Sequence, residues 1–361
     1  MPRPSPAAPS CPASAAEQSP LAARPLFVEV FAGTARLSQA LRDLNWDVAP
    51  IDWKGNRHTP LVPPILMDLT DPLRHEAFWE IMRKPNLAHV HFGVPCGTFS
   101  LARLRRTKIR GLPDPPQLRD QDNIRGYQPC TVEGCLGPAA GCRKALHGRD
   151  ISKVKKANAL VDLTVLAINW LSREHPTATW SVENPWKDLL WQWPDMPQPT
   201  STIGVVSDRE THTRASCADV LWEACMFGGG RDKTSRLRTN LHGLAHLARR
   251  CSGPKSHEPR ATDAHGRPLL HLPWSISLCR KGSAFATSEE AAYQAPLCAA
   301  IAKLCDNAHR PRFENRVLSI VKPGCARAAA PTKMRVTKAK AIAAAGRQPR
   351  GRAFARMVPE Y

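Results

Sequence analysis

Apolar and polar positions along the first half of the chain alternate between short apolar runs and amphipathic segments. Four apolar runs have the length of buried strands: 26–31, 46–52, 64–69 and 87–94. Leucines at helical spacing predict a helix directly after Gly33, with Thr34 as its cap, and residues 75–84 predict a second helix. Pro50 marks the second strand as irregular or near an edge. The alternation of strand and helix predicts a parallel sheet with helices on its faces.

The same alternation resumes in the second half of the chain after a long interruption. Residues 104–150 are rich in Pro, Arg and Gly and predict a long loop, and residues 248–284 predict irregular structure. The elements expected in this half are a helix over 154–174, a strand over 177–186, a strand with a glycine turn and a basic strand or loop over 218–241, and a helix over 288–308 capped by Ser288. The pattern indicates an α/β fold with a doubly wound, mostly parallel, Rossmann-like sheet and a small irregular insert region.

The net charge of the chain indicates what kind of molecule it binds. Lys and Arg number 51 against 31 Asp and Glu, a net charge of +20, which favours an anionic partner, most simply nucleic acid. Residues 322–361 carry ten Lys and Arg against one acid, which is typical of a disordered tail that binds phosphates or acts as a nuclear address. Twelve cysteines without a regular framework indicate a reducing, intracellular setting. The first 25 residues lack the apolar core of a secretory signal and are expected to form a disordered leader, and no run approaches the roughly 20 apolar residues of a membrane span.

Three features follow one another at the carboxyl ends of the first three predicted strands. Gly33 lies where a strand turns into a helix, Asp52 comes 19 residues later, and Asp68 ends the third strand. An acid at the place of Asp52 commonly accepts from ribose hydroxyls, and Asp68 lies where it could accept from an adenine amino group. No phosphate-binding lysine is present, so the interpretation is an adenosine ligand without phosphates. The alternative is an ordinary turn followed by two exposed strand-end carboxylates.

A cysteine and a carboxylic acid end the next two strands. Cys96 follows the fourth strand behind Pro95, where it is either buried apolar filler or a nucleophile activated by nearby positive charge. The basic residues nearest in sequence are Arg103, Arg105 and Arg106. Glu183 and Asn184 end the fifth strand, where the acid could protonate a ring nitrogen and the amide could hold the loop or the base. The alternative for this pair is an Asx-type turn closing the strand.

Two loose groups of cysteine and histidine remain. The first consists of Cys130, Cys135, Cys142 and His147, and the second of Cys251, His257, His265 and His271. Neither spacing matches a compact zinc pattern, so the prediction is polar loop residues and no metal site, with zinc ligation as the alternative.

At these motifs the chain resembles a known family. The segments FVEVFAGTARLSQAL, GVPCGTFS and VENPW, in this order and spacing, are similar to the cofactor, Pro-Cys and Glu-Asn motifs of cytosine-C5 DNA methyltransferases. GGGRDKTSRLRTN, residues 228–240, resembles the later basic motif of that family, with Arg231 or Lys233 matching its arginine. AAYQAPLCAAIA, residues 291–302, resembles the final helix that returns to the cofactor domain. The resemblance covers about residues 26–306 and is closest to short, divergent members.

The resemblance implies a methyltransferase-type Rossmann-like fold and a mechanism. S-adenosylmethionine is the implied cofactor, and the implied cofactor-binding residues are Phe31, Ala32, Gly33, Thr34, Asp52, Asp68 and Gly93. The implied catalytic residues are Cys96, Glu183, Asn184 and Arg231. In that mechanism a target cytosine leaves the base stack, the cysteine attacks C6, the glutamate protonates N3, and C5 takes the methyl group.

The resemblance also implies a domain organisation and leaves two alternatives. The expected segments are a leader over 1–25, a catalytic domain over 26–247, a small target-recognition-like region over 248–284, a returning helix over 285–310 and a basic tail over 311–361. The chain departs from the family motifs at Ala35, where a second glycine is usual, at Gly97, where glutamine is usual, and at Pro185, where valine is usual. The expected function is DNA cytosine methylation by a nuclear monomer. The alternatives are a tRNA-type RNA methyltransferase and a catalytically silent nucleic-acid-binding module.

Overall fold

The computed structural model describes the sheet, its covering helices and parts of the loops. The described residues are 24–101, 115–133, 135, 142, 144–203, 217–251, 261–262, 268–269, 271, 276–279, 282–285 and 292–320. The contacts divide the chain into two units, Met1–Ser319 and Ile320–Tyr361, and the sheet belongs to the first. No helix in the described part of the chain is long and apolar enough to cross a membrane.

An eight-stranded mixed sheet forms the centre of the first unit. Its strands are β1 (Leu26–Val30), β2 (Asp47–Asp52), β3 (Ile65–Leu66), β4 (Leu87–Gly93), β5 (Thr179–Pro185), β6 (Pro199–Ile203), β7 (Cys217–Glu223) and β8 (Thr234–Thr239). They are ordered β3-β2-β1-β4-β5-β8-β7-β6, and every pair is parallel except those that β8 makes with β5 and β7. The strand order reverses between β1 and β4, which is where open α/β sheets bind ligands. The fold is therefore α/β and compatible with a Rossmann-like fold, as predicted.

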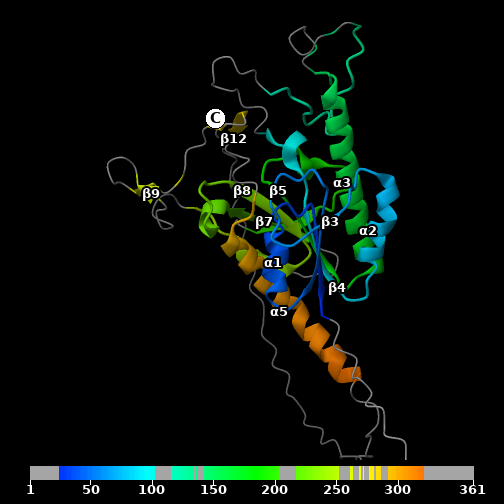
Figure 1. The fold of residues 1–361 in the computed structure, drawn as a ribbon, viewed down its shortest axis with the longest axis vertical. Coiled ribbons are helices and arrows are strands. Elements are labelled where there is room, and N and C mark those ends of the chain that lie inside the picture. The colour runs from blue at the N-terminus through cyan, green and yellow to red at the C-terminus, as the bar shows by residue number, and fades with distance from the viewer. Residues whose placement is uncertain are drawn as a thin grey trace, which may run out of the picture. The chain divides into compact units, whose positions relative to one another are not determined.

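Helices cover both faces of this sheet (Figure 1). The α-helices are α1 (Arg36–Arg42), α2 (His75–Met82), α3 (Arg149–Glu174) and α5 (Ala295–Ile320). Alternation along β1 divides the core between the two faces. Val28 packs in one apolar cluster with Phe78 of α2 and Ile168 of α3, whereas Phe27 packs in a second with residues of α1 and α5, including Leu37. The two clusters make the sheet doubly wound, as the sequence predicts.

Several elements differ in extent from the sequence-based expectation. β3 has two residues rather than six, so only Ile51 and Asp52 of β2 have a partner on the outer side, and Pro50 does not. This agrees with the edge position expected for Pro50. The cap position of α1 is Ala35, and it makes no side-chain hydrogen bond, so the prediction that Thr34 caps this helix is wrong.

The last helix begins and ends later than expected. α5 starts at Ala295 and continues to Ile320, although Pro311 lies inside it and a tail was expected from 311. Proline in a helix interior removes one hydrogen bond, and packing can offset that loss. Phe313 packs against the second core cluster beyond the proline, which gives the helix an apolar anchor there. Ser288 and residues 321–361 lie outside the described residues.

The region expected to be irregular contains two short antiparallel strand pairs. β9 (Ala261–Thr262) pairs with β10 (Pro268–Leu269), and β11 (Ile276–Cys279) pairs with β12 (Gly282–Phe285). In the described parts of the predicted loop over 104–150, before α3 begins, the one β-type pairing is an isolated bridge between Pro129 and Leu146. The expected leader is described only from Arg24 onward.

Candidate active site

The turn after β1 is strained and brings two predicted cofactor residues together. Phe31, Gly33 and Ala35 have φ angles of 62°, 56° and 50°, in the left-handed region that costs a non-glycine residue about 1–2 kcal/mol. This path places the Gly33 amide beside β2, where it donates to Oδ2 of Asp52 at 2.7 Å. Ala32 donates its amide to the carbonyl of Ile51 at 3.1 Å. The sequence-predicted glycine and acid are therefore in direct contact.

Most acceptor positions of Asp52 are already filled. Oδ2 accepts from Gly33 and from the Asn56 amide nitrogen at 3.0 Å, and Oδ1 accepts from the Trp53 backbone at 2.8 Å. Burial raises the pKa of this carboxyl, and the backbone hydrogen bonds oppose the rise. A carboxylate oxygen accepts two hydrogen bonds, so Oδ1 retains capacity for one hydroxyl donor. Because the Gly33 amide is bound to Asp52, it is not directed at a phosphate.

Trp53 is a surface feature that the sequence analysis missed. Its side chain is 54% exposed although it follows a buried strand end. The indole ring lies against Gly55, where an added Cβ would come within 2.4 Å of the ring. A half-exposed aromatic ring beside an acid with a remaining acceptor position can stack on a planar ligand group. The dipeptide Asp52-Trp53 at a strand end was the available signal.

Asp68 and Thr34 have mainly local roles. Oδ1 of Asp68 accepts from the amide and the hydroxyl of Thr70 at 3.0 and 2.7 Å, and these bonds lower the pKa of the carboxyl. Asp68 is exposed, in agreement with the strand-end interpretation that the sequence left open. Thr34 accepts the Leu61 amide at its backbone carbonyl, at 2.9 Å.

Gly93 lies where β1, β4 and the start of the C-terminal helix region meet. It is in register with Glu183 across the β4–β5 pair. A Cβ at this position would come within 3.4 Å of the Phe31 carbonyl and of the Tyr293 hydroxyl. A glycine here allows the strained turn after β1 to approach the end of β4 closely.

Cys96 shares its surroundings with the predicted acid. It begins a short 3₁₀ helix, η2 (Cys96–Thr98), and is partly exposed. Its pKa is raised to about 11, chiefly by burial and further by the charges of Asp188 and Glu183, while Lys233 opposes the rise. The sulfur is therefore a thiol at pH 7 in the ligand-free protein, and its activation by positive charge stays a prediction. Arg103, the first of the arginines expected to activate it, lies outside the described residues with the others.

Glu183 and Asn184 have different roles at the end of β5. Oε2 of Glu183 accepts from the Tyr293 hydroxyl at 3.2 Å, whereas Oε1 is buried and has no hydrogen-bond partner within the described residues. A buried acceptor without a donor is costly, so Oε1 is suited to accept from a bound ligand. Asn184 is fully buried and donates to the Val94 carbonyl at 2.7 Å. It ties the loop that carries Cys96 to β5, which makes it a positioning residue.

Asp188 is a second buried carboxyl that no sequence motif indicated. It is 3% exposed, and its Oδ2 has no partner in the part of the chain that the structure describes. Burial raises its pKa to about 8, and the charge of Glu183 adds to the rise, against hydrogen bonds from the Ser100 side chain and the Leu101 backbone. Cys96 is therefore close to two carboxyl groups and one ammonium group.

A buried chain of hydrogen bonds leads away from Glu183 through the sheet. Its members are, in order from Glu183, Tyr293, His91, Ser181, His89, Thr179 and His309, with successive distances of 3.2, 2.9, 2.8, 2.9, 2.7 and 2.8 Å. Burial lowers the pKa of His91 to about 3 and of His309 to about 4, and lowers that of His89 far below its usual range. All three histidines are therefore neutral at pH 7.

One assignment of protons gives every donor in this series of hydrogen bonds an acceptor. If each histidine carries its proton on Nε2, each Nε2–H donates to the next hydroxyl, and each hydroxyl donates to the next Nδ1 or finally to the Glu183 carboxylate. The far end of the chain, His309, lines a cavity of about 370 Å³ with residues that include Leu87 and Ala88 at the start of β4. This series of hydrogen bonds thus connects Glu183 with the cavity beside His309, at the start of β4.

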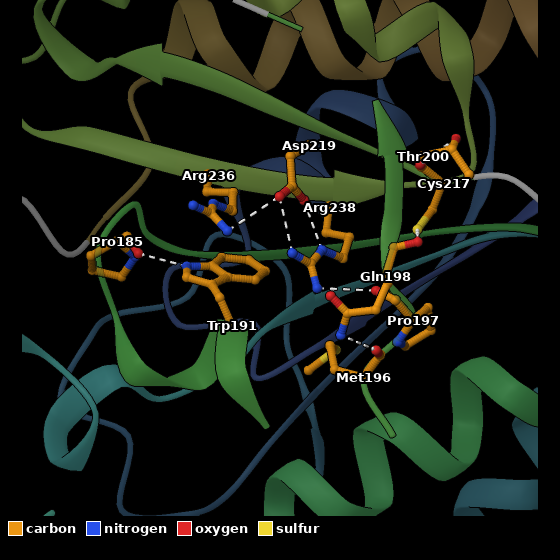
Figure 2. Close-up of polar contacts among 10 residues, drawn as sticks. All are labelled: Pro185, Trp191, Met196, Pro197, Gln198, Thr200, Cys217, Asp219, Arg236 and Arg238. Carbon is orange, nitrogen blue, oxygen red and sulfur yellow. Dashed lines mark hydrogen bonds and ion pairs between the residues drawn. The ribbon is translucent and has the colours of Figure 1, made fainter. Parts of the chain in front are cut away.

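Two arginines of the basic segment are structural (Figure 2). Nε and Nη2 of Arg238 contact the two carboxylate oxygens of Asp219 at 2.7 and 2.9 Å, and Arg236 contacts the same carboxylate at 3.2 Å. Both guanidinium groups lie about 5 Å from the ring of Trp191, at 5.0 and 5.1 Å, and the Trp191 indole donates to the Pro185 carbonyl at 2.8 Å. This cluster joins β7 and β8 to the end of β5.

Lys233 is a cation in the electrostatic surroundings of Cys96, and the catalytic role predicted for Arg231 stays a prediction. Arg231 is 5% exposed, and the charge that opposes the pKa rises of Cys96 and Asp188 is that of Lys233. Lys233 was the other sequence match to the basic motif.

At each of the two cysteine groups, three side chains lie closer together in space than the sequence spacing suggested. Cys130, Cys135 and Cys142 lie with all three sulfur atoms within 4.8 Å of one another, and so do the ligand atoms of Cys225, Cys251 and His271. Cys225 was not part of the predicted second group, and His257 and His265 lie outside the described residues. Three members of the first predicted group therefore lie together, as do Cys251 and His271 of the second, and the choice between polar loop residues and zinc ligands stays a prediction.

Comparison with known proteins does not identify a family for this chain. No protein-family model matches the chain, and a search of curated proteins finds no similar sequence. The function must therefore be argued from the arrangement of the site and from the motifs themselves.

Proposed function

We propose that this protein is an S-adenosylmethionine-dependent methyltransferase that acts on C5 of cytosine in DNA through a covalent adduct at Cys96. The observation that carries the proposal is the common surroundings of Cys96 and Glu183 at the ends of β4 and β5, where the charge of Glu183 contributes to the raised pKa of the Cys96 thiol. A nucleophile and a proton donor that act on one pyrimidine ring need this proximity.

The residues at the end of β1 and β2 fit an adenosine-type ligand. Asp52 has one acceptor position left for a ribose hydroxyl, and the exposed Trp53 ring offers a stacking surface. The occupied Gly33 amide argues against a phosphate-bearing ligand. When bound there, S-adenosylmethionine supplies an electrophilic methyl group on a sulfonium.

The protons of the first step balance within the chain's own groups. The Cys96 thiol loses its proton as sulfur bonds to C6 of cytosine, and N3 of the ring gains one. Glu183 is the proton donor to N3, and the thiol proton passes to the pair of carboxyl groups formed by Glu183 and Asp188. No net proton is therefore required from solvent. After C5 has taken the methyl group, a base removes the C5 proton, which leaves to solvent, and the bond between C6 and sulfur breaks. The N3 proton then returns through the carboxyl pair to the sulfur and restores the thiol.

Asn184 and Tyr293 hold Cys96 and Glu183 in position. Asn184 fixes the loop of Cys96 to β5 through the Val94 carbonyl, and Tyr293 fixes Oε2 of Glu183, which leaves Oε1 for the base. The net charge of +20 supplies the sequence-independent attraction to a phosphate backbone. A cytosine within a duplex must leave the base stack to reach the Cys96 thiol.

Transfer of tritium from methyl-labelled S-adenosylmethionine to DNA and, separately, to RNA tests the proposal. We expect label in DNA cytosine with the wild-type chain and none with Cys96→Ser. Cys217→Ser is the matched control, because Cys217 is buried in β7 and its sulfur donates to the Gln198 carbonyl, which a serine hydroxyl can also do. Label in RNA alone would replace DNA by RNA as substrate, and no label in either, with binding retained, would favour a silent binding module.

A further inference from the structure

We propose that Cys130, Cys135 and Cys142 bind one structural Zn²⁺ ion as three thiolate ligands, with His147 as the fourth ligand. This site is independent of the proposed methyl transfer. It lies in the loop between η2 and α3, outside the residues that surround Cys96.

The sulfur positions are those of a metal site and not of a disulfide. The Sγ atom of Cys142 lies 3.5 Å from that of Cys130 and 3.4 Å from that of Cys135. A disulfide bond is about 2.05 Å long, so none of these pairs is bonded. Ligands at about 2.3 Å from a tetrahedral zinc ion lie about 3.8 Å apart, close to the separations here. The three sulfur atoms lie within 4.8 Å of one another, so one ion can contact all three.

Backbone hydrogen bonds hold the three cysteines in this arrangement. The Cys130 amide donates to the Leu146 carbonyl at 2.9 Å, and the Leu146 amide donates to the Gln128 carbonyl at 2.9 Å. The Ala145 amide donates to the Cys142 carbonyl at 3.2 Å, which closes a turn directly after the third cysteine. The two ends of the segment therefore meet at the sulfur cluster.

We assign His147 as the fourth ligand, although its ring nitrogens are not among the ligand atoms that lie within 4.8 Å of one another in the ion-free protein. It follows Leu146, whose backbone pairs with the strand-like residues before Cys130. Its Nε2 is buried, with no hydrogen-bond partner among the residues described. A buried imidazole nitrogen without a partner is a costly group unless it binds something. Three cysteines and one histidine form a common structural zinc set.

The loop has too small a core of its own to hold these positions. Its apolar cluster consists of Leu118, Tyr127, Leu146 and Val154, of which the last belongs to α3. Segments with so little buried surface depend on a staple such as a disulfide or a metal ion. Zinc binding to thiolates supplies folding free energy directly.

The same segment supports the turn that carries Cys96. Arg119, which is 2% exposed, donates to the Thr98 hydroxyl at 2.9 Å and lies 3.8 Å from the centre of the Phe99 ring. The Tyr127 amide donates to the Leu118 carbonyl at 3.0 Å, which connects Arg119 with the residues that precede Cys130. Loss of the ion would therefore loosen the support of η2 as well as the loop itself.

Zinc content per chain tests the proposal directly. The full-length protein is purified under reducing conditions with zinc present, and bound zinc is measured by elemental mass spectrometry for the wild type, Cys142→Ser and the control Cys217→Ser. We expect Cys142→Ser to hold one zinc ion fewer per chain than the wild type and Cys217→Ser to hold the same number. Because the comparison is a difference, zinc bound at Cys225, Cys251 and His271 does not change it.

Two further measurements cover a variant that fails to fold. Cys142→His keeps a zinc ligand and is expected to restore both the ion and the melting temperature. In the Cys251→Ser chain, which lacks the second cluster, one equivalent of Co²⁺ should give a thiolate charge-transfer band of the intensity of three sulfur ligands. Equal zinc in Cys142→Ser and wild type, a cobalt band of two sulfur ligands or none, or a disulfide found by alkylation would overturn the proposal.

Discussion

The hydroxyl group of Tyr293 donates to Oε2 of Glu183 at 3.2 Å, across 110 positions of sequence. Burial, reinforced by the charge of Glu183, raises the pKa of Tyr293 well above its usual range, so the phenol stays protonated and keeps its role as donor. This contact fixes one oxygen of the carboxyl group and directs the other at the site. It also ends the chain of neutral histidines that crosses the sheet.

Tyr293→Phe should therefore weaken both folding and activity. The change leaves Oε2 of Glu183 without its donor and His91 Nε2 without its acceptor, at a cost of about 1–3 kcal/mol in the free energy of unfolding. We expect methyl transfer to fall roughly tenfold, equivalent to about 1.4 kcal/mol of lost positioning. Denaturant unfolding and kcat measure the two effects. His309→Gln, at the far end of the chain, keeps a nitrogen donor to Thr179 and should leave kcat unchanged.

Gly33 and Gly97 should respond differently to an added methyl group. Gly33 has a φ of +56° and its amide is bound to Asp52, so Gly33→Ala should cost about 1–2 kcal/mol and weaken cofactor binding. An added Cβ at Gly97 has no atom within 4 Å and the residue has no left-handed φ, so Gly97→Ala should be neutral or stabilise by up to about 1 kcal/mol. Thermal unfolding and calorimetric titration with S-adenosylmethionine measure both. A larger loss at Gly97 than at Gly33 would contradict the described turn.

Asp188 should make stability depend on pH. Its folded pKa of about 8 lies above the ordinary value of about 3.9, so folding takes up a proton between these values. Stability contributed by this group is therefore full below about pH 4 and falls as the pH rises towards 8, by at most about 1.4 kcal/mol per pH unit. Asp188→Asn should flatten the fall between pH 5 and 8, and the exposed Asp122→Asn should not. An unchanged slope in Asp188→Asn would show that this carboxyl is not buried as described.

The buried ion pair between Asp219 of β7 and Arg238 of β8 should contribute more to stability than an exposed ion pair. Asp219→Asn leaves Arg238, 2% exposed, without its carboxylate and should cost about 3–5 kcal/mol. Glu76→Gln removes an exposed partner of Arg83 and should cost less than about 1 kcal/mol. Urea unfolding of the two variants measures the difference. Equal effects would mean that the Asp219 cluster is open to water.

The sequence was sufficient to predict which side chains of the candidate site lie together at the carboxyl ends of the strands. Gly33 follows β1, Asp52 ends β2, Cys96 follows β4 and Glu183 lies near the end of β5. Parallel strands bring their carboxyl ends to one edge of the sheet. The doubly wound sheet followed from the same alternation. Residue types and order at strand ends therefore predicted which side chains come together.

What the sequence could not give depends on burial and on long-range contacts. Asp188 and Tyr293 belong to no local pattern, and their roles follow from packing against Glu183. The raised pKa of Cys96 reflects burial, which local basic residues do not reveal. The three-cysteine cluster was dismissed because its spacing is irregular, although backbone pairing near Leu146 brings the sulfurs together.

A covalent trap tests the central claim most directly. The chain is incubated with S-adenosylmethionine and an oligonucleotide in which 5-fluorocytosine replaces cytosine. Fluorine takes the place of the C5 proton whose removal would release the sulfur, so the adduct cannot break down. The account predicts a product that survives denaturation, with the mass of one chain plus one oligonucleotide that carries the transferred methyl group, and predicts its absence in Cys96→Ser. No such product with any cytosine context, or an equal yield from Cys96→Ser, would contradict the account.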